Sequence, residues 1–455
     1  MSAEDRQRIS ARWGMQIAAV MAVMALAAEL FRINDPWMLL PLGLCVTVSV
    51  LWLHFRFSAV DAAVLAVCLY DVATWILNPI TGMYAARISL TGLCAYLLLR
   101  EASCRAESIS LFLKLSAGIA GIALAITLAS FSIWTRAVHG AGFTDVYPFR
   151  FLFRPFGYIT NAWASVWLPV LGMLAMGIYR IDRWRKVFGI CWVLASVTML
   201  LSFSRGAFVS WAVYVTVLCV SMATWRYRLV LVAVCVFIVG TVWMLFPTET
   251  GTTLAMKRTE SQRQSTESRF RATEQAMTVI KEHLWTGTGN GSYTLAMDRV
   301  LNEDSTRPYT SYAPNVVVQV LVEKGLTGMM LYIGLCAAVV IYWIKYRKKK
   351  TMTAIAACLL AVGVKEMTMS IMLADGSVWI LTLISLALMQ TEAESGNETV
   401  RSVRLTAWIR YMPLAVGCCC WIAFMVLDTR LRMDNKAVEQ ACEAWKKGNH
   451  KGQII

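Results

Sequence analysis

The chain has 455 residues, of which 58% are hydrophobic and 16% are charged, and its formal net charge is +15. Soluble domains carry about 25% charged residues, and the mean hydropathy here is +0.57. This composition excludes an ordinary soluble protein and predicts an all-α polytopic membrane protein. We therefore do not interpret the positive charge as a nucleic-acid binding surface, and we expect no nucleic-acid partner. The thirteen cysteines lie mostly inside apolar runs without CxxC or metal-ligand spacing. They therefore read as small apolar residues, and we expect no metal and no cofactor.

Apolar stretches recur along the whole chain, each close to the roughly 20 residues that cross a bilayer. The first follows the charged tail MSAEDRQRISAR and has no small-residue cleavage site, so it reads as a retained span and not as a signal peptide. We predict about 12–13 transmembrane helices, near residues 14–30, 36–53, 59–77, 84–99, 109–134, 160–179, 186–203, 206–224, 229–246, 325–344, 352–372, 377–390 and 408–427.

Basic clusters occur at every second connection between these spans. Lys and Arg gather on the cytoplasmic side of membrane proteins, so the pattern predicts a cytoplasmic N-terminus and an external C-terminus. The clusters are Arg6/Arg8/Arg12, Arg56, Arg100/Arg105, Arg180/Arg183/Arg185/Lys186, Arg226/Arg228, Lys345/Arg347/Lys348/Lys349/Lys350 and Arg401/Arg404.

Four regions follow from this topology. Residues 1–246 form an N-terminal transmembrane bundle, and residues 247–324 form a large external loop. Residues 325–428 form the C-terminal transmembrane helices, and residues 429–455 form an external polar tail with one marginal helix.

The external loop is predicted to be partly helical. In RFRATEQAMTVIKEHLW the apolar residues Phe270, Met277, Ile280 and Leu284 have helical spacing. A glycine-rich turn, GTGNGSY, follows. Because no strand precedes it and no GK[ST] follows, it reads as a helix-ending turn and not as a nucleotide loop. The next apolar helix, NVVVQVLVEK, ends at the glycine stop Gly325.

Charged residues stand unusually deep in the apolar segments on the predicted outer side. Arginine is costly at membrane depth, and its rigid fork of donors matches phosphate oxygens. The pattern predicts an outer cavity for the anionic headgroup of a lipid carrier. Alternatively, Asp71, Lys365 and Glu366 form structural ion pairs and the loop arginines are only solvated. The charges concerned are Asp71, Arg87, Arg205, Lys365 and Glu366 within spans, and Arg136, Arg150, Arg154, Lys257, Arg258, Arg263, Arg269 and Arg271 in external loops.

Four motifs in a fixed order carry a family resemblance. RPFGYITNAWASVWLP (154–169), SFSRGAFVSWAV, RFRATEQAMTVIKEHLWTGTGNGSY and NVVVQVLVEKGLTGMMLY resemble the O-antigen ligase and O-antigen polymerase family over roughly residues 150–345. The resemblance implies a metal-independent membrane glycosyltransferase on the outer face of the bacterial inner (cytoplasmic) membrane. The implied donor is an oligosaccharide on undecaprenyl pyrophosphate. The implied acceptor is another glycan or a lipid-linked saccharide.

The resemblance also implies roles for single residues. Arg205, in the SRG motif, and Arg269, before the amphipathic helix, would hold the pyrophosphate and act in catalysis. Further binding residues would be Arg154, Asn161, Arg271, Asn315 and Lys365.

One position departs from the family pattern. Family ligases usually have a histidine just before the asparagine of YAPNVVVQ, where this chain has Pro314. The sequence therefore does not identify a general base. Glu366 and His139 are the first candidates, and Asp145 and Glu323 are further ones. Alternatively, the good leaving group makes a base dispensable. The departure favours a polymerase or an inactive homologue over a standard ligase. A lipid-linked oligosaccharide flippase and a non-catalytic envelope scaffold are the alternative functions.

Overall fold

A computed structural model describes residues 3–33, 57–78, 82–222, 224–254, 260–301 and 313–394. All of these belong to one compact unit, and the chain's second unit, residues 35–53 with 403–455, lies outside them. The spans predicted at 36–53 and 408–427 and the predicted tail helix therefore fall outside the described residues.

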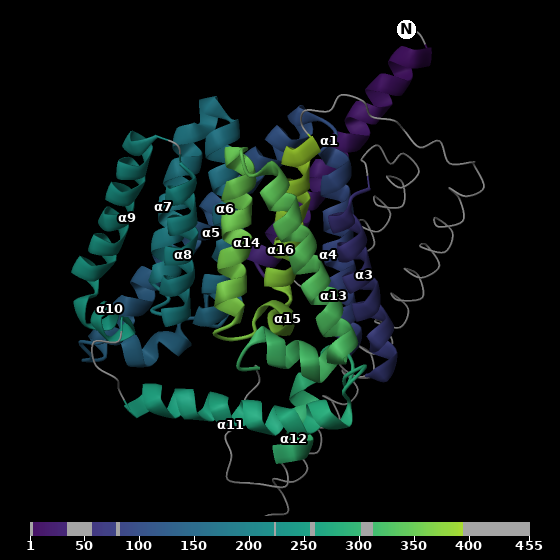
Figure 1. The fold of residues 1–455 in the computed structure, drawn as a ribbon. Coiled ribbons are helices and arrows are strands. Elements are labelled where there is room, and N and C mark those ends of the chain that lie inside the picture. Colours follow the sequence, from purple (N-terminus) through teal and green to yellow (C-terminus); the bar gives the residue numbers. More distant parts are fainter. Residues whose placement is uncertain are drawn as a thin grey trace, which may run out of the picture. The chain divides into compact units, whose positions relative to one another are not determined.

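The described chain is built of helices, with no strand among its described residues (Figure 1). The α-helices are α1 Ala3–Leu30, α3 Ala59–Ala73, α4 Gly82–Ala102, α5 Ala106–Gly140, α6 Thr160–Arg180, α7 Arg185–Leu200, α8 Arg205–Ser221, α9 Trp225–Leu245, α10 Pro247–Thr253, α11 Glu260–Glu282, α12 Tyr293–Leu301, α13 Val316–Tyr346, α14 Lys350–Glu366, α15 Met372–Asp375 and α16 Ser377–Glu394. The 3-10 helices are η2 Thr74–Leu77, η3 Tyr147–Leu152, η4 Pro155–Gly157 and η5 Asp182–Trp184.

Helix α6 forms the centre of the bundle and packs against α7, α14 and α16. Its Trp163 and Trp167 are fully buried and meet edge to face, with ring centroids 5.2 Å apart. Small residues allow the close helix crossings, as is common in membranes. A Cβ on Gly172 would overlap Cys358 of α14, and one on Gly177 would overlap the Phe188 ring of α7.

Several helices are long and apolar enough to cross a membrane. Five meet both criteria among the described residues, namely Trp13–Leu30 of α1 together with α5, α6, α9 and α13, and the shorter α8 and the first part of α16 are also apolar. On α9 the large side chains face outward, with Phe237 68% and Met244 85% exposed. In water such exposure would be unfavourable, whereas lipid solvates these side chains. The predicted class, an all-α polytopic membrane protein, is confirmed.

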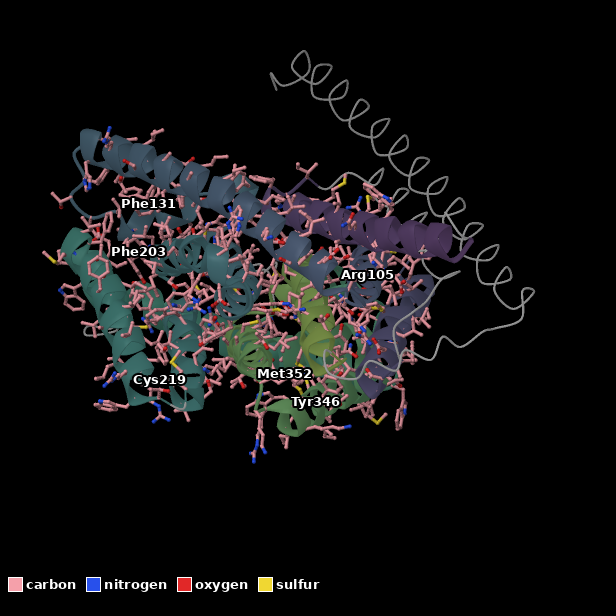
Figure 2. All side chains as sticks on the ribbon, turned by 90° about the horizontal axis from the view of Figure 1, so that it is seen from above. Arg105, Phe131, Phe203, Cys219, Tyr346 and Met352 are labelled. Carbon is pink, nitrogen blue, oxygen red and sulfur yellow. The ribbon has the colours of Figure 1, made fainter. Side chains whose placement is uncertain are left out.

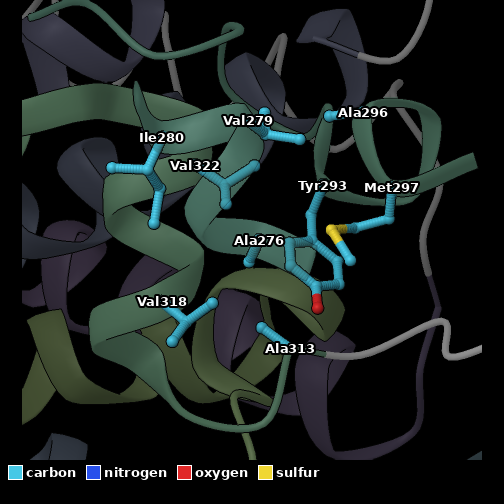
Figure 3. Packing of buried hydrophobic residues seen from close by; sticks show 9 residues of the cluster. All are labelled: Ala276, Val279, Ile280, Tyr293, Ala296, Met297, Ala313, Val318 and Val322. Carbon is cyan, nitrogen blue, oxygen red and sulfur yellow. The ribbon is translucent and has the colours of Figure 1, made fainter. Parts of the chain in front are cut away.

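Helix α11 runs across one end of the bundle, transverse to α13 and α14 (Figure 1). It packs with α12 and the start of α13 around a small apolar core (Figure 3). The core contains Ala276, Val279 and Ile280 of α11, Tyr293, Ala296 and Met297 of α12, Ala313, and Val318 and Val322 of α13. The predicted loop helix is thus confirmed, with its own buried face.

The prediction of which side of α11 is buried is wrong. Ile280 is buried, but Phe270 is 73% and Met277 45% exposed, and Leu284, which follows the helix, is 40% exposed. The buried face instead runs through Ala272 and Ala276 to Val279 and Ile280.

The glycine-rich turn pairs its backbone with a kink in α13. Thr288 N and Gly289 N donate to Val322 O and Glu323 O at 2.9 and 2.8 Å, and Leu326 N donates to Leu284 O at 2.8 Å. Gly325 interrupts α13 at φ 61° and ψ −164°, so the predicted stop at this residue is confirmed as a break within one long helix. The turn therefore follows the end of α11, as predicted, and docks it onto α13.

Two buried ion pairs join helices of the bundle. Lys324 Nζ lies 2.5 Å from Asp71 Oδ1, and Ser89 Oγ donates to Asp71 Oδ2 at 2.8 Å. Arg100 Nε lies 2.9 Å from Asp61 Oδ1, with both side chains buried. Asp71 is thus a structural ion-pair partner. Arg100, predicted as part of a basic cluster that sets the membrane orientation, also joins two helices through its ion pair with Asp61.

Candidate functional site

The SFSRG segment forms a tight turn between α7 and α8. Phe203 adopts a left-handed φ of 47°, which is strained for a bulky residue. Its ring is 1% exposed and lies near Phe131, with ring centroids 6.5 Å apart (Figure 2). The Phe246 ring centroid is 5.6 Å from that of Phe203. Thr253 Oγ1 donates to the Phe203 carbonyl at 3.3 Å. This packing holds the turn and places the exposed Arg205 at the first position of α8.

The glycine of the SRG motif lies against the segment that follows α14. We name residues 367–376, which include α15 and connect α14 to α16, the connecting loop. A Cβ on Gly206 would overlap the Thr368 hydroxyl and come within 3.3 Å of Lys365 Cδ. The Thr368 hydroxyl itself donates to Lys365 O at 2.7 Å. Glycine at 206 therefore lets the Arg205 turn approach Lys365, which is 1% exposed.

Arg269 reaches the same place from α11. Its Nη1 donates to the Thr368 carbonyl at 2.7 Å. Partial burial and the Arg205 charge lower the pKa of Arg269. The Arg269 charge in turn acts on Lys365. Arg205, Arg269 and Lys365 are thus close enough to repel one another.

Arg150 joins these cations from η3. Its guanidinium stacks over the Tyr147 ring at 3.8 Å, and Nη1 donates to Tyr147 O at 2.8 Å. Burial lowers the pKa of Arg150, and the Arg205 charge lowers it further, although Tyr147 and Asp145 oppose the effect. We name Arg150, Arg205, Arg269 and Lys365 the cation cluster.

The cation cluster is incompletely neutralised. Within the described part of the chain, Arg205 and Arg269 form no ion pair. Arg205 is the first residue of α8, and no side chain caps this helix end. The first backbone amides of α8 and the positive end of its dipole therefore lie at Arg205. Guanidinium forks beside a helix N-terminus bind phosphate-like anions well. The arrangement is suited to an anionic phosphate group.

A carboxylate lies directly beside the cation cluster. Glu366 is 1% exposed, and its Oε2 accepts hydrogen bonds from the amides of Ile371 and Met372 at 2.7 and 2.8 Å. Its Oε1 has no hydrogen-bond partner among the described residues. The connecting loop thus fixes the carboxylate by one oxygen and leaves the other unused.

Two predicted binding residues contact nearby backbone or the connecting loop. Asn161 Nδ2 lies 3.7 Å from Met369 Sδ of that loop. Asn315 caps α13 by accepting from Val318 N at 2.9 Å. The neighbouring Ala313 carbonyl accepts from Ser370 N at 3.2 Å, so the segment around Pro314 lies against the connecting loop.

The other predicted residues make local or no contacts. Arg154 donates to Phe151 O at 3.4 Å, and His139 Nδ1 lies 2.8 Å from Phe143 O at the exposed end of α5. Arg271 is exposed and stands two positions from Arg269, and helical residues two apart face different sides. The structure therefore brings together Arg205, Arg269, Lys365 and Glu366.

Sequence reasoning did not single out two members of the site. Arg150 was one of many loop arginines, although its aromatic surroundings, YPFRFLF, were a usable signal for a stacked guanidinium. Thr368 contributes its backbone carbonyl and a close contact with Gly206. Nothing in the sequence around Thr368 marks such a role.

Comparison with known protein families gives one match. Residues 190–333 match the family model described as O-antigen ligase. None of the curated proteins compared with the chain matches its sequence. The matched segment contains Arg205 and Arg269, whereas Lys365 and Glu366 follow it. Residues 190–333 are thus similar to an O-antigen ligase domain, and this match within a multi-pass membrane chain supports a glycan-transferring membrane enzyme.

Proposed function

We propose that the chain transfers or polymerises glycan from an undecaprenyl-pyrophosphate carrier on the outer face of the bacterial inner membrane. The observation that carries the proposal is the cation cluster. Three arginines and a lysine from four separate segments converge there, and Arg205 lowers the pKa of both Arg150 and Arg269. Cations that repel one another stay close together only where the rest of the fold holds them there, which favours a binding site for an anion.

The chemistry of the donor fits such a site. When the bond between the anomeric carbon and the phosphate oxygen breaks, its electron pair stays on the departing pyrophosphate. Preorganised cations aimed at that developing charge stabilise the transition state, and one lost donor costs about 10²–10³ in rate. In this proposal Arg205 and Arg269 hold the pyrophosphate, and Arg150 and Lys365 add positive charge beside it. Asn161 lies where it would contact the glycan.

The acceptor decides whether the product is a polymer or a ligated glycan. The family description favours ligation, while proline at position 314 departs from the ligase pattern. Both reactions break the same donor bond. The two readings therefore share the cation cluster and differ only in what supplies the attacking hydroxyl.

The test uses protein purified in detergent and an undecaprenyl-pyrophosphate-linked oligosaccharide, without nucleotide. Products are separated on a gel, with and without a core saccharide acceptor. We expect a ladder for a polymerase or a single shifted product for a ligase. Either product should fall about 10²–10³-fold in Arg205→Ala and Arg269→Ala.

Arg271→Ala is the matched control, because Arg271 lies on the same helix but is not in the cation cluster. It should leave transfer unchanged. If the wild-type protein binds the carrier through Arg205 yet yields no product, a flippase replaces the enzyme proposal. If it neither binds nor transfers, the scaffold reading replaces it.

A further inference from the structure

We propose that Glu366 is the group that accepts the proton of the attacking sugar hydroxyl, and that the acceptor saccharide lies against the connecting loop. This inference rests on the proposed function and adds the acceptor side to it. Three independent observations on the loop carry it.

The first observation is the fixed orientation of the Glu366 carboxylate. Its Oε2 is held by two consecutive amides, those of Ile371 and Met372, at 2.7 and 2.8 Å. A side chain with several rotatable bonds is thereby restricted to one direction. Preorganisation of this kind is what a proton acceptor needs, because geometry precedes proton affinity in choosing a base.

The second observation is a pair of unused buried polar atoms. Glu366 Oε1 and the hydroxyl of Ser370 have no partner among the described residues, although the two residues are 1% and 0% exposed. Buried polar atoms are nearly always hydrogen-bonded. Two exceptions four residues apart, at the end of α14 and on the connecting loop, indicate that a polar ligand, here a saccharide with several hydroxyls, completes them.

The third observation is the position of the loop relative to the cation cluster. Lys365 is the neighbour of Glu366, and Thr368 contacts both Gly206 and Arg269. A donor pyrophosphate held by Arg205 and Arg269 would therefore lie near Thr368, two residues after Glu366. The candidate base and the leaving-group site share one short stretch of chain.

The proposed step is balanced as follows. A hydroxyl oxygen of the acceptor attacks the anomeric carbon of the donor and forms the new glycosidic bond. The bond from that carbon to the phosphate oxygen breaks, and its electrons leave with the pyrophosphate at the cation cluster. The hydroxyl proton passes to Glu366 Oε1 and is later released to water.

The test compares Glu366→Gln with the matched control Asp375→Asn, which removes the other carboxylate of the loop. Glutamine keeps an oxygen for the Ile371 and Met372 amides but cannot take the proton. We expect Glu366→Gln to lower transfer about 10²–10⁴-fold, while binding of the lipid-linked donor stays at the wild-type level. Asp375→Asn should retain transfer. Wild-type transfer by Glu366→Gln would overturn the inference.

A second measurement uses the wild-type protein, in case Glu366→Gln does not fold. The transfer rate should fall as the pH is lowered from neutrality to 4, because a protonated Glu366 cannot accept the proton. Donor binding should stay constant over this range. Among the described residues the charge that acts on Glu366 is that of its neighbour Lys365, and the carboxylate of the connecting loop is Asp375, at the end of α15. The acid fall should persist in Asp375→Asn. A flat rate over this range would overturn the inference.

The two proposals fail differently. An inactive wild-type protein would contradict the proposed function itself. An active wild-type protein whose rate depends on Arg205 but not on Glu366 would contradict only this inference.

Discussion

The guanidinium of Arg269 donates a 2.7 Å hydrogen bond to the main-chain carbonyl of Thr368, 99 positions later in the chain. This bond ties the outer helix α11 to the connecting loop. Hydrogen bonds to charged groups contribute about 1.5–3 kcal/mol. Arg269→Gln should therefore raise the opening constant of residues 367–376 about tenfold or more. Amide hydrogen exchange followed by mass spectrometry measures it. Equal exchange in Arg269→Gln and the control Arg271→Gln would show that the bond does not hold the loop.

Gly206 is required for the approach of the Arg205 turn to α14. In Gly206→Ala the new methyl group would meet the Thr368 hydroxyl and Lys365. Overpacking of this kind costs about 1–3 kcal/mol, so both the thermal midpoint in detergent and donor binding should fall. Gly363→Ala is the control, because nothing lies within 4 Å of a Cβ at this α14 position. The contact has no role if both variants behave alike.

Repulsion within the cation cluster should lower the stability of the protein. Burial, and after it the Arg205 charge, lower the pKa of Arg150 and Arg269, so the folded state disfavours their protonated forms. This penalty is present at every pH where they are charged. Arg205→Gln relieves the repulsion. Its thermal midpoint without ligand should equal or exceed that of the wild type, whereas removal of an ordinary structural residue lowers it.

Inorganic pyrophosphate provides the complementary measurement on the same pair of proteins. A ligand at 100 times its Kd stabilises the folded state by about 2.7 kcal/mol. Wild-type protein should show a rising thermal midpoint with pyrophosphate, and Arg205→Gln should not. A rise of the same size in both would place the anion elsewhere.

Gly325 breaks α13 so that the glycine-rich turn can dock. Its φ of 61° is unfavourable for other residues, and a Cβ there would meet the backbone of Trp285 and Gly287. Gly325→Ala should lower the thermal midpoint and detach the glycine-rich turn from α13, which limited proteolysis between α11 and α13 would detect. Gly334→Ala, on the same helix with open space around it, should resist cleavage like the wild type. Cleavage of both at equal rates would disprove a local role for the kink.

The sequence predicts the helical membrane class and much of the site for a simple reason. Charges are so costly in apolar segments that Arg205, Lys365 and Glu366 stand out without any structure. The break at Gly325 is also predictable, because glycine after an apolar helical run is a common stop.

Other features depend on tertiary packing and escape the sequence pattern. The buried face of α11 is lined largely by alanine, so the larger Phe270 and Met277 suggest the wrong side. Arg150 approaches Arg205 because η3 packs near the start of α8, and the spacing of residues in the sequence does not reveal this contact. Thr368 acts through its carbonyl, a group that every residue possesses.

The connecting loop has a consequence for biosynthesis. Ribosomes make α8 and α11 well before α14 and α16, so the arginines of the nascent chain exist before the carbonyl and carboxylate that they meet. The site is completed only when the late hairpin of α14 and α16 enters the membrane beside α6 and α4. A chain released before residue 350 would contain the whole matched family segment and still lack Lys365, Glu366 and the Thr368 carbonyl that accepts from Arg269. Completion of the cation cluster therefore depends on insertion of α14, which is synthesised after the matched segment.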